Sequence, residues 1–516
     1  MKRILAIALL LMIYSGVSAQ IDGDILFGQD QVITIDLQFE SSDYYTQLVN
    51  FYNAGANEYL GANLTITDQA GVQEFISVGV RFKGNSSFGH PGTKKSFKID
   101  FNEFVSGQNY DGLKKLNFSN CFKDPSMMRE KVFFDVCQAA GVPAPRTSFA
   151  NVIMNGEAIG FYAVVEQIDD QFLDWRIQDD AGNLFKAGDN FGGGPGGGGS
   201  AADLFYYGND QTSYADRYEL NTNEDVNDWT DLIELIDFIN NSSELEFESE
   251  IENHIELTEY LRSAALDMLF SNLDSYTGSA RNYYIYHNST SNRWEWIKWD
   301  GNESFGSYTN NAGNMISLAL NYHNNTRPLL DNIFNNSVLY NKYLNEVCDL
   351  TENFFNSSYI NLRIDELKVL IAEHVYADGN KMYSNANFDT NIESDIIAGG
   401  PGPGGTTYGL KSFVQSRSSF LANQNDCNVF TGIDNSINSR ATIFPNPSSS
   451  LVNISWGYTA EMSISIFDIV GKQVYFQATQ NTQDLTLDLS EYPKGIYLIR
   501  LAESNGHVSQ QKLILQ

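Results

Sequence analysis

Three oxygen-bearing side chains lie in residues 270–306 at places where secondary structure is expected to begin or end. A helical pattern ends near Asp274, Asn282 begins the apolar segment NYYIYHN, and Asp300 ends the tryptophan-rich segment RWEWIKWD. The two apolar segments are expected to form a hairpin through the polar turn STSN, which can bring the three residues together.

Carboxylate and amide oxygens suit a hard cation such as Mg²⁺, which shares itself with waters and phosphates. A spare carboxylate nearby can accept the proton of an attacking hydroxyl. The pattern therefore indicates a site for phosphoryl transfer, with one base and two metal ligands. The same residue types also cap helices and form turns, and this simpler interpretation stays open.

A second candidate region is the hairpin RFKGNSSFGHPGTKKSFKID, residues 81–100. Its loop is rich in glycine and serine, including Ser87, and can lay backbone N–H groups over phosphates. A lysine on the returning strand can reach the phosphate oxygens, and Lys98 in the strand interior is the best candidate. An exposed hairpin with solvated lysines is the alternative.

The elements that must position these residues follow from periodicity. Alternation predicts strands over 31–39 and 94–101, and a hairpin over 149–168 with its turn at Asn155-Gly156. A helix is expected over 124–140, capped by Asp124 or Ser126. Further helical patterns are a short one at 43–52 and longer ones at 228–241, 256–273, 329–355, 358–378 and 410–424.

The two ends of the chain differ from the middle. Residues 1–19 have the charged start, apolar run and small-residue cleavage site of a secretory signal peptide. No later run approaches the roughly eighteen apolar residues of a membrane helix, so no transmembrane segment is expected. Residues 192–200 and 399–405 form Gly-rich loops within a domain expected over 27–428. After a linker at 429–440, short strands over 441–516 predict a separate β-sandwich.

Charge and cysteine content exclude several classes of protein. The chain has 516 residues and a net charge of −32, from 64 acidic and 32 basic residues, which argues against nucleic acid as a partner. Six scattered histidines and four cysteines without a CxxC pair make a zinc site improbable. Pairing Cys121 with Cys137 and Cys348 with Cys427 gives the shorter loops, but the sequence leaves all three pairings open.

Five motifs occur in order along the chain: RFKGNSS…KKSFKIDF, DPSMMRE, GFYAVVEQID, GNLFKA and SNLDSYTGSARNYYIYHN…WEWIKWDGNESFG. Over about residues 30–425 they resemble the CotH family of spore-coat-H-like atypical kinases. The resemblance implies an α+β fold, namely a two-lobed protein-kinase-like domain followed by a small all-β sandwich. It implies ATP and Mg²⁺ or Mn²⁺ as cofactors and an exported protein as substrate.

The resemblance also implies roles for single residues. Asp274 is similar in position to the catalytic aspartate, and Asn282 and Asp300 to the metal ligands. Lys98 is the candidate phosphate-binding lysine, with Arg81 and Lys186 as rivals. Glu166 is expected to orient that lysine or to lie near the nucleotide, and Glu130 is the alternative partner.

One position departs from the family pattern, which has a second aspartate after the strand where this chain has Asn302. The loss of a carboxylate can weaken metal binding, and Glu303 is the nearest acid that can compensate. Two functions therefore remain: a secreted Ser/Thr kinase, or a degenerate relative that binds ligands at the cell surface without turnover.

The C-terminal region has a resemblance of its own. The segments FPNPSSSLVNI, SISIFDIVGKQV and DLSEYPKGIYLIRL resemble a type IX secretion sorting domain. The resemblance implies that residues 441–516 contact the type IX secretion machinery. The expected location is the medium or cell surface of a Gram-negative bacterium.

Overall fold

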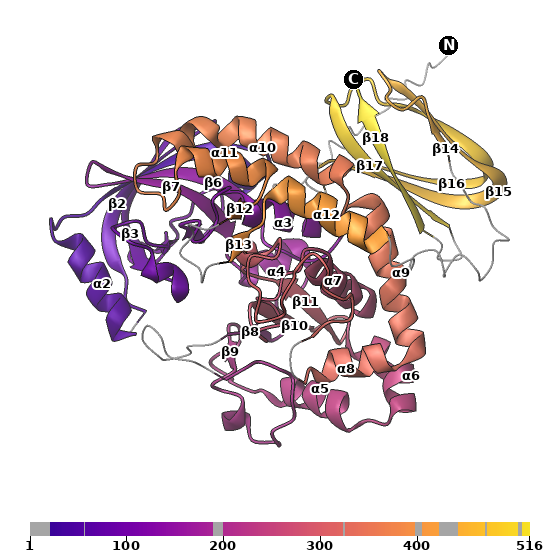
Figure 1. Ribbon diagram of the computed structural model, residues 1–516, viewed down its shortest axis with the longest axis horizontal. Helices are drawn as coiled ribbons and strands as arrows, with labels where there is room; N and C mark the ends of the chain where they lie inside the picture. The colour runs from indigo at the N-terminus through magenta and orange to yellow at the C-terminus, as the bar shows by residue number, and fades with distance from the viewer. Residues whose placement is uncertain are drawn as a thin grey trace, which may run out of the picture.

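Figure 1 shows the computed structural model of the chain, which describes residues 21–55, 57–188, 200–323, 326–397, 405–422, 442–469, 472–503 and 508–516. Helices and strands are mixed up to residue 422, and the described C-terminal residues are all β, as expected. The expected signal peptide and linker, and most of the two Gly-rich loops, lie outside the described residues.

The first part of the chain forms a closed barrel of seven strands in the order β1-β2-β3-β4-β5-β7-β6. The strands predicted over 31–39 and 94–101 and the hairpin over 149–168 are confirmed within it. Closure comes from parallel pairing of β1 with β6, which the periodicity did not predict. The bounds are β1 Val32–Gln38, β2 Leu60–Asp68, β3 Gly71–Phe82, β4 Phe97–Asp100, β5 Lys115–Ser119, β6 Thr147–Met154 and β7 Glu157–Glu166.

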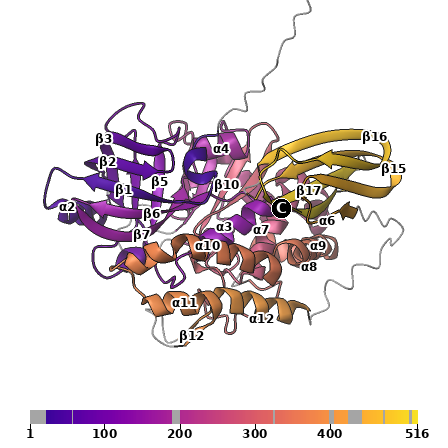
Figure 2. The ribbon, with the colours of Figure 1, turned by 90° about the horizontal axis from the view of Figure 1, so that it is seen from above.

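Strand β7 is buried on both of its faces. Tyr162 and Val164 point into the barrel core, whereas Phe161, Ala163 and Val165 pack into the larger core outside the barrel. Helix α10 (Ser357–Ala377) packs against β7, α3 and α12 (Leu410–Ala422), and so joins the barrel to the rest of the molecule (Figure 2).

The expected helix over 124–140 is shorter in the structure, where α3 spans Arg129–Ala139. Residues before it cannot be helical, because Cys121, Lys123 and Met127 have φ values of 55°, 61° and 55°. The carboxylate of Asp124 still acts at the helix start by accepting the backbone N–H of Arg129 at 2.9 Å. The short elements α1 (Asp24–Phe27), α2 (Tyr44–Ala54) and η1 (Ser86–Gly89) complete the barrel region.

A second sheet has the order β11-β10-β8-β9 and is surrounded by helices. The expected hairpin is confirmed as β10 (Tyr283–Asn288) and β11 (Arg293–Lys298), with Tyr283 opposite Lys298. The helix expected over 329–355 is instead two helices, because the Asn336 side chain caps the second one. The other bounds are α4 Asp170–Arg176, β8 Leu184–Ala187, η2 Gln211–Ser213, β9 Tyr218–Leu220, α5 Thr230–Asn241, α6 Glu244–His254, α7 Leu257–Leu269, η3 Gly301–Glu303, α8 Pro328–Asn335, α9 Ser337–Asn353, α11 Asn385–Glu393, β12 Ile396–Ile397 and β13 Thr406–Thr407.

The C-terminal strands build a core of their own around residues such as Trp456 and Ile464. The short strands expected over 441–516 include one long strand in the structure, β15 (Leu451–Phe467). This long strand pairs with β14, β16 and β17, so hydrogen bonds connect all five strands into one sheet. The remaining bounds are β14 Thr442–Phe444, β16 Gln473–Asp488, β17 Gly495–Glu503 and β18 Val508–Leu515.

The shorter-loop pairing of the cysteines is wrong for the first pair. Cys121, before α3, and Cys137, within α3, are buried free thiols. Cys348 is disulfide-bonded, and Cys427 lies outside the described residues. Within the described part of the chain, no helix combines the length and apolar character needed to cross a membrane.

Candidate active site

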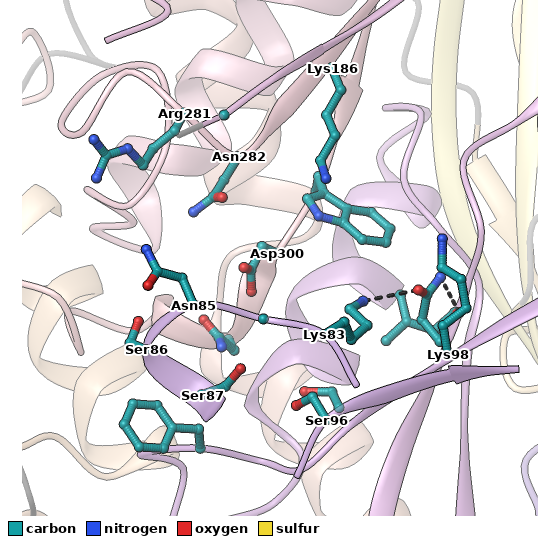
Figure 3. A pocket seen from close by; sticks show the side chains of 18 of the residues that line it. Lys83, Asn85, Ser86, Ser87, Ser96, Lys98, Lys186, Arg281, Asn282 and Asp300 are labelled. Atoms are coloured by element: carbon teal, nitrogen blue, oxygen red, sulfur yellow. Dashed lines mark hydrogen bonds between the residues drawn. The ribbon is translucent and has the colours of Figure 1, made fainter. Parts of the chain in front are cut away.

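A cavity of about 580 Å³ lies between the barrel and the second sheet. The barrel contributes the ends of β3 and β4 and the loop at 84–87, and the other side contributes β8 and the loops around β10 and β11. Seven of the eight expected site residues line it, all except Glu166: Asp274, Asn282, Asp300, Lys98, Arg81, Ser87 and Lys186. Figure 3 shows Asn282, Asp300 and Lys186 around the same space, to which they come from different elements.

Asp274 lies in a loop and not at a helix end as expected, because α7 already ends at Leu269. Buried Arg327 holds this loop by donating to the carbonyls of Tyr276 and Gly278, each at 2.6 Å. Burial, and then the nearby Asp300 carboxylate, raises the pKa of Asp274 to about 7. A carboxyl with such a pKa is suited to exchange a proton near neutral pH.

The backbone at Asn282 and Asp300 is left-handed, with φ values of 61° and 54°. Asparagine and aspartate tolerate this region better than other non-glycine residues, at a cost of roughly 1–2 kcal/mol each. The Asn282 Nδ2 donates to the Asp274 carbonyl at 2.9 Å, which orients its Oδ1 as the remaining acceptor. Strain at two neighbouring polar residues is typical of functional sites.

The tryptophan-rich strand holds Asp300 rigidly. Trp296 stacks on Tyr283 of the paired strand with ring centroids 4.3 Å apart. After the strand, a Cβ atom at Gly301 would lie 2.5 Å from Phe133 of α3, so only glycine fits there. Asp300 is thus fixed by a rigid strand before it and a close helix contact after it.

Two further oxygens of this loop are buried without a hydrogen-bond partner, Asn302 Oδ1 and Glu303 Oε2. Both residues line the cavity, and Lys123 binds the other oxygen of Glu303 at 3.1 Å. In the part of the chain that the structure describes, no group of three His, Cys, Asp or Glu side chains could hold a metal by itself. Mg²⁺ needs only one or two carboxylates beside waters and phosphates, so Asp300 with the amide oxygens of Asn282 and Asn302 fits this ion.

Lys83 is the residue that the sequence interpretation missed. Its ammonium donates to Asn117 Oδ1 at 3.0 Å. Burial, and then Lys186, lowers the pKa of Lys83 to about 8, while Asp300 and Glu130 oppose this shift. Burial also lowers the pKa of Lys98 well below its ordinary value, and the charges that act on it are Arg81 and other lysines. Lys83 is therefore the lysine beside the acidic groups, and Figure 3 shows it between Lys98 and Asp300.

The sequence contained one signal for Lys83. It lies directly before Gly84, at the exit from β3 into the loop, where a side chain can turn toward a ligand. Lys98 was favoured because it lies within β4, and alternation assigns each residue of a strand to one face. Alternation does not predict where a residue just beyond a strand, such as Lys83, will point.

The expected role of Glu166 is wrong. Its side chain, 3% exposed, binds the Arg146 guanidinium at 2.6 Å and accepts from the Trp175 indole N–H at 2.9 Å, outside the cavity. Glu130 on α3 lines the cavity instead. Burial, and then Asp300, raises the pKa of Glu130 to about 8, and Lys83 opposes this shift. Glu130, and not Glu166, is thus the glutamate that shares the cavity with Lys83.

The Gly/Ser loop covers the cavity in a defined conformation. Gly84 has a φ of 88°, and a Cβ there would lie 2.0 Å from Ser87 Oγ. The Tyr52 hydroxyl donates to the Gly84 carbonyl at 2.6 Å, and Asn120 Nδ2 donates to the Ser87 carbonyl at 3.1 Å. The two side-chain contacts occupy carbonyl groups of the loop, so its N–H groups are the atoms suited to an anionic ligand.

Comparison with known proteins gives two family matches. The model described as CotH kinase protein matches residues 80–419, and the one described as secretion system C-terminal sorting domain matches residues 442–516. The inner spore coat protein H of Bacillus subtilis (strain 168) is 30% identical over 213 residues. That match covers 41% of this chain and 55% of the relative, so the chain spans about half of that protein.

Two solved structures resemble the chain over small parts only. A protein with an immunoglobulin-like β-sandwich fold from Bacteroides vulgatus is 17% identical, with a TM-score of 0.14, over 15% of this chain and 87% of its own. CopC from Methylosinus trichosporium OB3b is 33% identical, with a TM-score of 0.12, over 14% of this chain and 79% of its own.

Proposed function

The chain belongs to the CotH kinase protein family, and we propose that it is a secreted protein kinase. In this proposal it transfers the γ-phosphate of ATP to a Ser or Thr hydroxyl of an exported protein and uses Mg²⁺ or Mn²⁺. The barrel and the helix-rich part then act as the two lobes of a kinase-like fold, with the nucleotide between them.

One observation carries the proposal. Asp274, Asn282 and Asp300 come from three loops and line one cavity together with a cluster of basic residues. A chain with a net charge of −32 places six basic side chains here beside six acidic ones, which favours a polyanion bound together with a divalent cation, such as a metal-bound triphosphate. These side chains are Arg81, Lys83, Lys98, Lys123, Lys186 and Arg281.

In the proposed reaction, Asp274 accepts the proton of the acceptor hydroxyl. The hydroxyl oxygen bonds to the γ-phosphorus, the bond from that phosphorus to the β–γ bridging oxygen breaks, and ADP leaves with the electron pair. Lys83, held by Asn117, neutralises charge on the phosphate oxygens. A divalent cation at Asp300 and Asn282 would supply further positive charge to the phosphates.

The secretion sorting domain at residues 442–516 supports export of the protein. We propose that residues 1–19 direct it into the periplasm of a Gram-negative bacterium as a signal peptide. The C-terminal strands then engage the type IX secretion machinery. The acceptor is accordingly another exported or surface protein.

The test is transfer of labelled γ-phosphate by the purified protein with Mg²⁺ or Mn²⁺, next to Asp274→Asn. The wild type is expected to label acceptor protein, and Asp274→Asn to lose at least about 100-fold in rate while it still binds ATP in calorimetry. Full activity of Asp274→Asn excludes this aspartate as the base. The absence of any ATP binding favours the alternative, a degenerate surface-binding protein, which Asn302 in place of an aspartate suggests.

A further inference from the structure

A second cavity, of about 550 Å³, adjoins the first. The two share the lining residues Arg281 and Tyr308. Ser279 lines the second cavity and belongs to the same loop as Asp274, which lines the first. The loop at 274–281 therefore lies at the junction of the two spaces. None of the residues of the Gly/Ser loop at 84–87 lines the second cavity.

One wall of the second cavity, residues 201–207, contains no helix or strand but has a fixed backbone. Buried tyrosines hold it: the Tyr283 hydroxyl donates to the Ala202 carbonyl at 2.6 Å, and the Tyr276 hydroxyl donates to the Asp203 carbonyl at 3.2 Å. Two more tyrosines hold the wall further along, because Leu204 N donates to the Tyr218 hydroxyl and Tyr207 N donates to the Tyr214 hydroxyl. Asn240 Nδ2 also donates to the Leu204 carbonyl.

This rigid wall presents two aromatic side chains to solvent. Phe205 is 44% exposed and Tyr207 is 38% exposed, with ring centroids 5.5 Å apart. Tyr207 is fixed further, because the Arg217 guanidinium lies 3.9 Å from its ring centroid and its hydroxyl donates to Asp203. Aromatic groups that are already ordered can bind a partner with little loss of conformational entropy.

The rest of the lining is polar and includes Asn310, Thr326 and Arg281. Such groups can pair with the backbone of an extended peptide, while the aromatic pair contacts one of its side chains. A macromolecular acceptor must place its hydroxyl at Asp274, and the second cavity borders the loop that carries Asp274 without contacting the phosphate-binding loop.

We propose that the second cavity binds an extended segment of the acceptor protein, with a large apolar side chain against Phe205 and Tyr207. This inference rests on the proposed kinase function and adds the class of substrate. The acceptor segment contains a Ser or Thr and, at a fixed number of residues before or after it, an aromatic or large aliphatic residue. Each residue of an extended chain spans about 3.3–3.6 Å, so that distance is set by the separation of Asp274 from the aromatic pair.

The experiment uses a peptide library with a central Ser or Thr and every amino acid tested at each flanking position. The full-length wild type is compared with Phe205→Ala/Tyr207→Ala. Wild type is expected to prefer a large apolar residue at one position. The double variant is expected to lose this preference and to raise the KM for the best peptide by roughly tenfold, the effect of about 1.4 kcal/mol of lost contact.

Two readouts must stay unchanged in the double variant: the KM for ATP and the slow hydrolysis of ATP without peptide. Phe104→Ala is the matched control, since Phe104 is 51% exposed but belongs to the barrel region near Gly61. It is expected to leave the peptide preference intact. An unchanged peptide KM in the double variant, or no positional preference in the wild type, overturns the inference.

Failure of the proposed function gives a different result. The same library, immobilised as an array, is probed for binding by Asp274→Asn and by Asp274→Asn with Phe205→Ala/Tyr207→Ala. If the wild type neither binds ATP nor transfers phosphate, the kinase proposal fails, and the array still tests the cavity. Loss of apolar-position binding in the triple variant supports it, and equal binding contradicts it.

Discussion

The carboxylate of Asp267 and the ammonium of Lys298 form an ion pair of 2.6 Å, and their side chains are only 5% and 3% exposed. Asp267 belongs to α7 and also accepts a hydrogen bond from Asn272 Nδ2 at 3.1 Å. Asn272 lies two residues before Asp274, and Lys298 lies two residues before Asp300. One buried carboxylate thus ties together the loop of the proposed base and the strand of the proposed metal ligand.

Asp267→Asn is expected to lower kcat at least tenfold and to destabilise the protein by about 3–5 kcal/mol, because Lys298 becomes an unpaired buried charge. Asp267→Asn/Lys298→Met should recover much of the stability but not kcat. The checks are thermal denaturation and steady-state kinetics.

The control for this pair is Arg262→Met on the same helix. Arg262 binds Glu346 at 2.6 Å and Asp349 at 2.7 Å, away from both loops. The Arg262→Met variant should have a lower melting temperature than the wild type and an unchanged kcat. If the double variant regains full kcat, the pair has a structural role only.

Asn302→Asp is expected to strengthen metal binding. The Oδ1 atom of Asn302 is buried in the cavity without a partner, and an aspartate would add a carboxylate beside Asp300 and Glu303. The concentration of Mn²⁺ for half-maximal activity should fall by roughly threefold to tenfold. Without metal the variant should melt at a lower temperature, since three acidic groups then lie together. Equal metal dependence of variant and wild type would mean that residue 302 does not face the ion.

Lys83→Met and Lys98→Met are expected to have different effects on kcat/KM for ATP and on the melting temperature. Lys83 is placed near Asp300 and Glu130, so its loss should lower kcat/KM for ATP by roughly 10²-fold to 10³-fold. Lys98→Met should retain most activity and raise the melting temperature, because it removes a buried ammonium whose charged form is disfavoured by burial and by neighbouring cations. The reverse ranking in nucleotide titrations would restore Lys98 as the phosphate-binding lysine.

Glu259→Gln tests a pair of carboxyl groups, Glu259 and Glu295, that lines neither cavity. Burial, and then Glu295, holds the pKa of Glu259 well above its ordinary value. The folded state therefore binds the proton more tightly than the unfolded state, and this group lowers stability as pH rises above about 4.3. The glutamine variant should melt at a higher temperature than wild type at pH 8, with a smaller difference at pH 4.5. A difference that does not grow with pH would show that Glu259 ionises normally.

Local pattern was sufficient for much of the scaffold. The β10–β11 hairpin, the Asn155-Gly156 turn and helices α5, α7, α10 and α12 follow from periodicity and turn residues, whereas α6 and α11 were not predicted. Asp300 at a strand end was visible for the same reason, since a polar residue after an apolar alternation marks the point where the chain leaves the core. These features depend on neighbours within a few residues, which the sequence states directly.

The partners across the fold were decided by tertiary structure. Parallel pairing of β1 with β6 closes the barrel, Asp267 meets Lys298, and Glu130 rather than Glu166 faces the cavity. Glu166 and Glu130 are both glutamates in the sequence, and only packing determines that Glu166 binds Arg146 whereas Glu130 lines the cavity with Lys83. The sequence by itself determined most of the residues that can do chemistry, including Asp274, Asn282 and Asp300, and the elements next to them. Their convergence required the three-dimensional fold, because burial and charge pairing between distant segments have no local period.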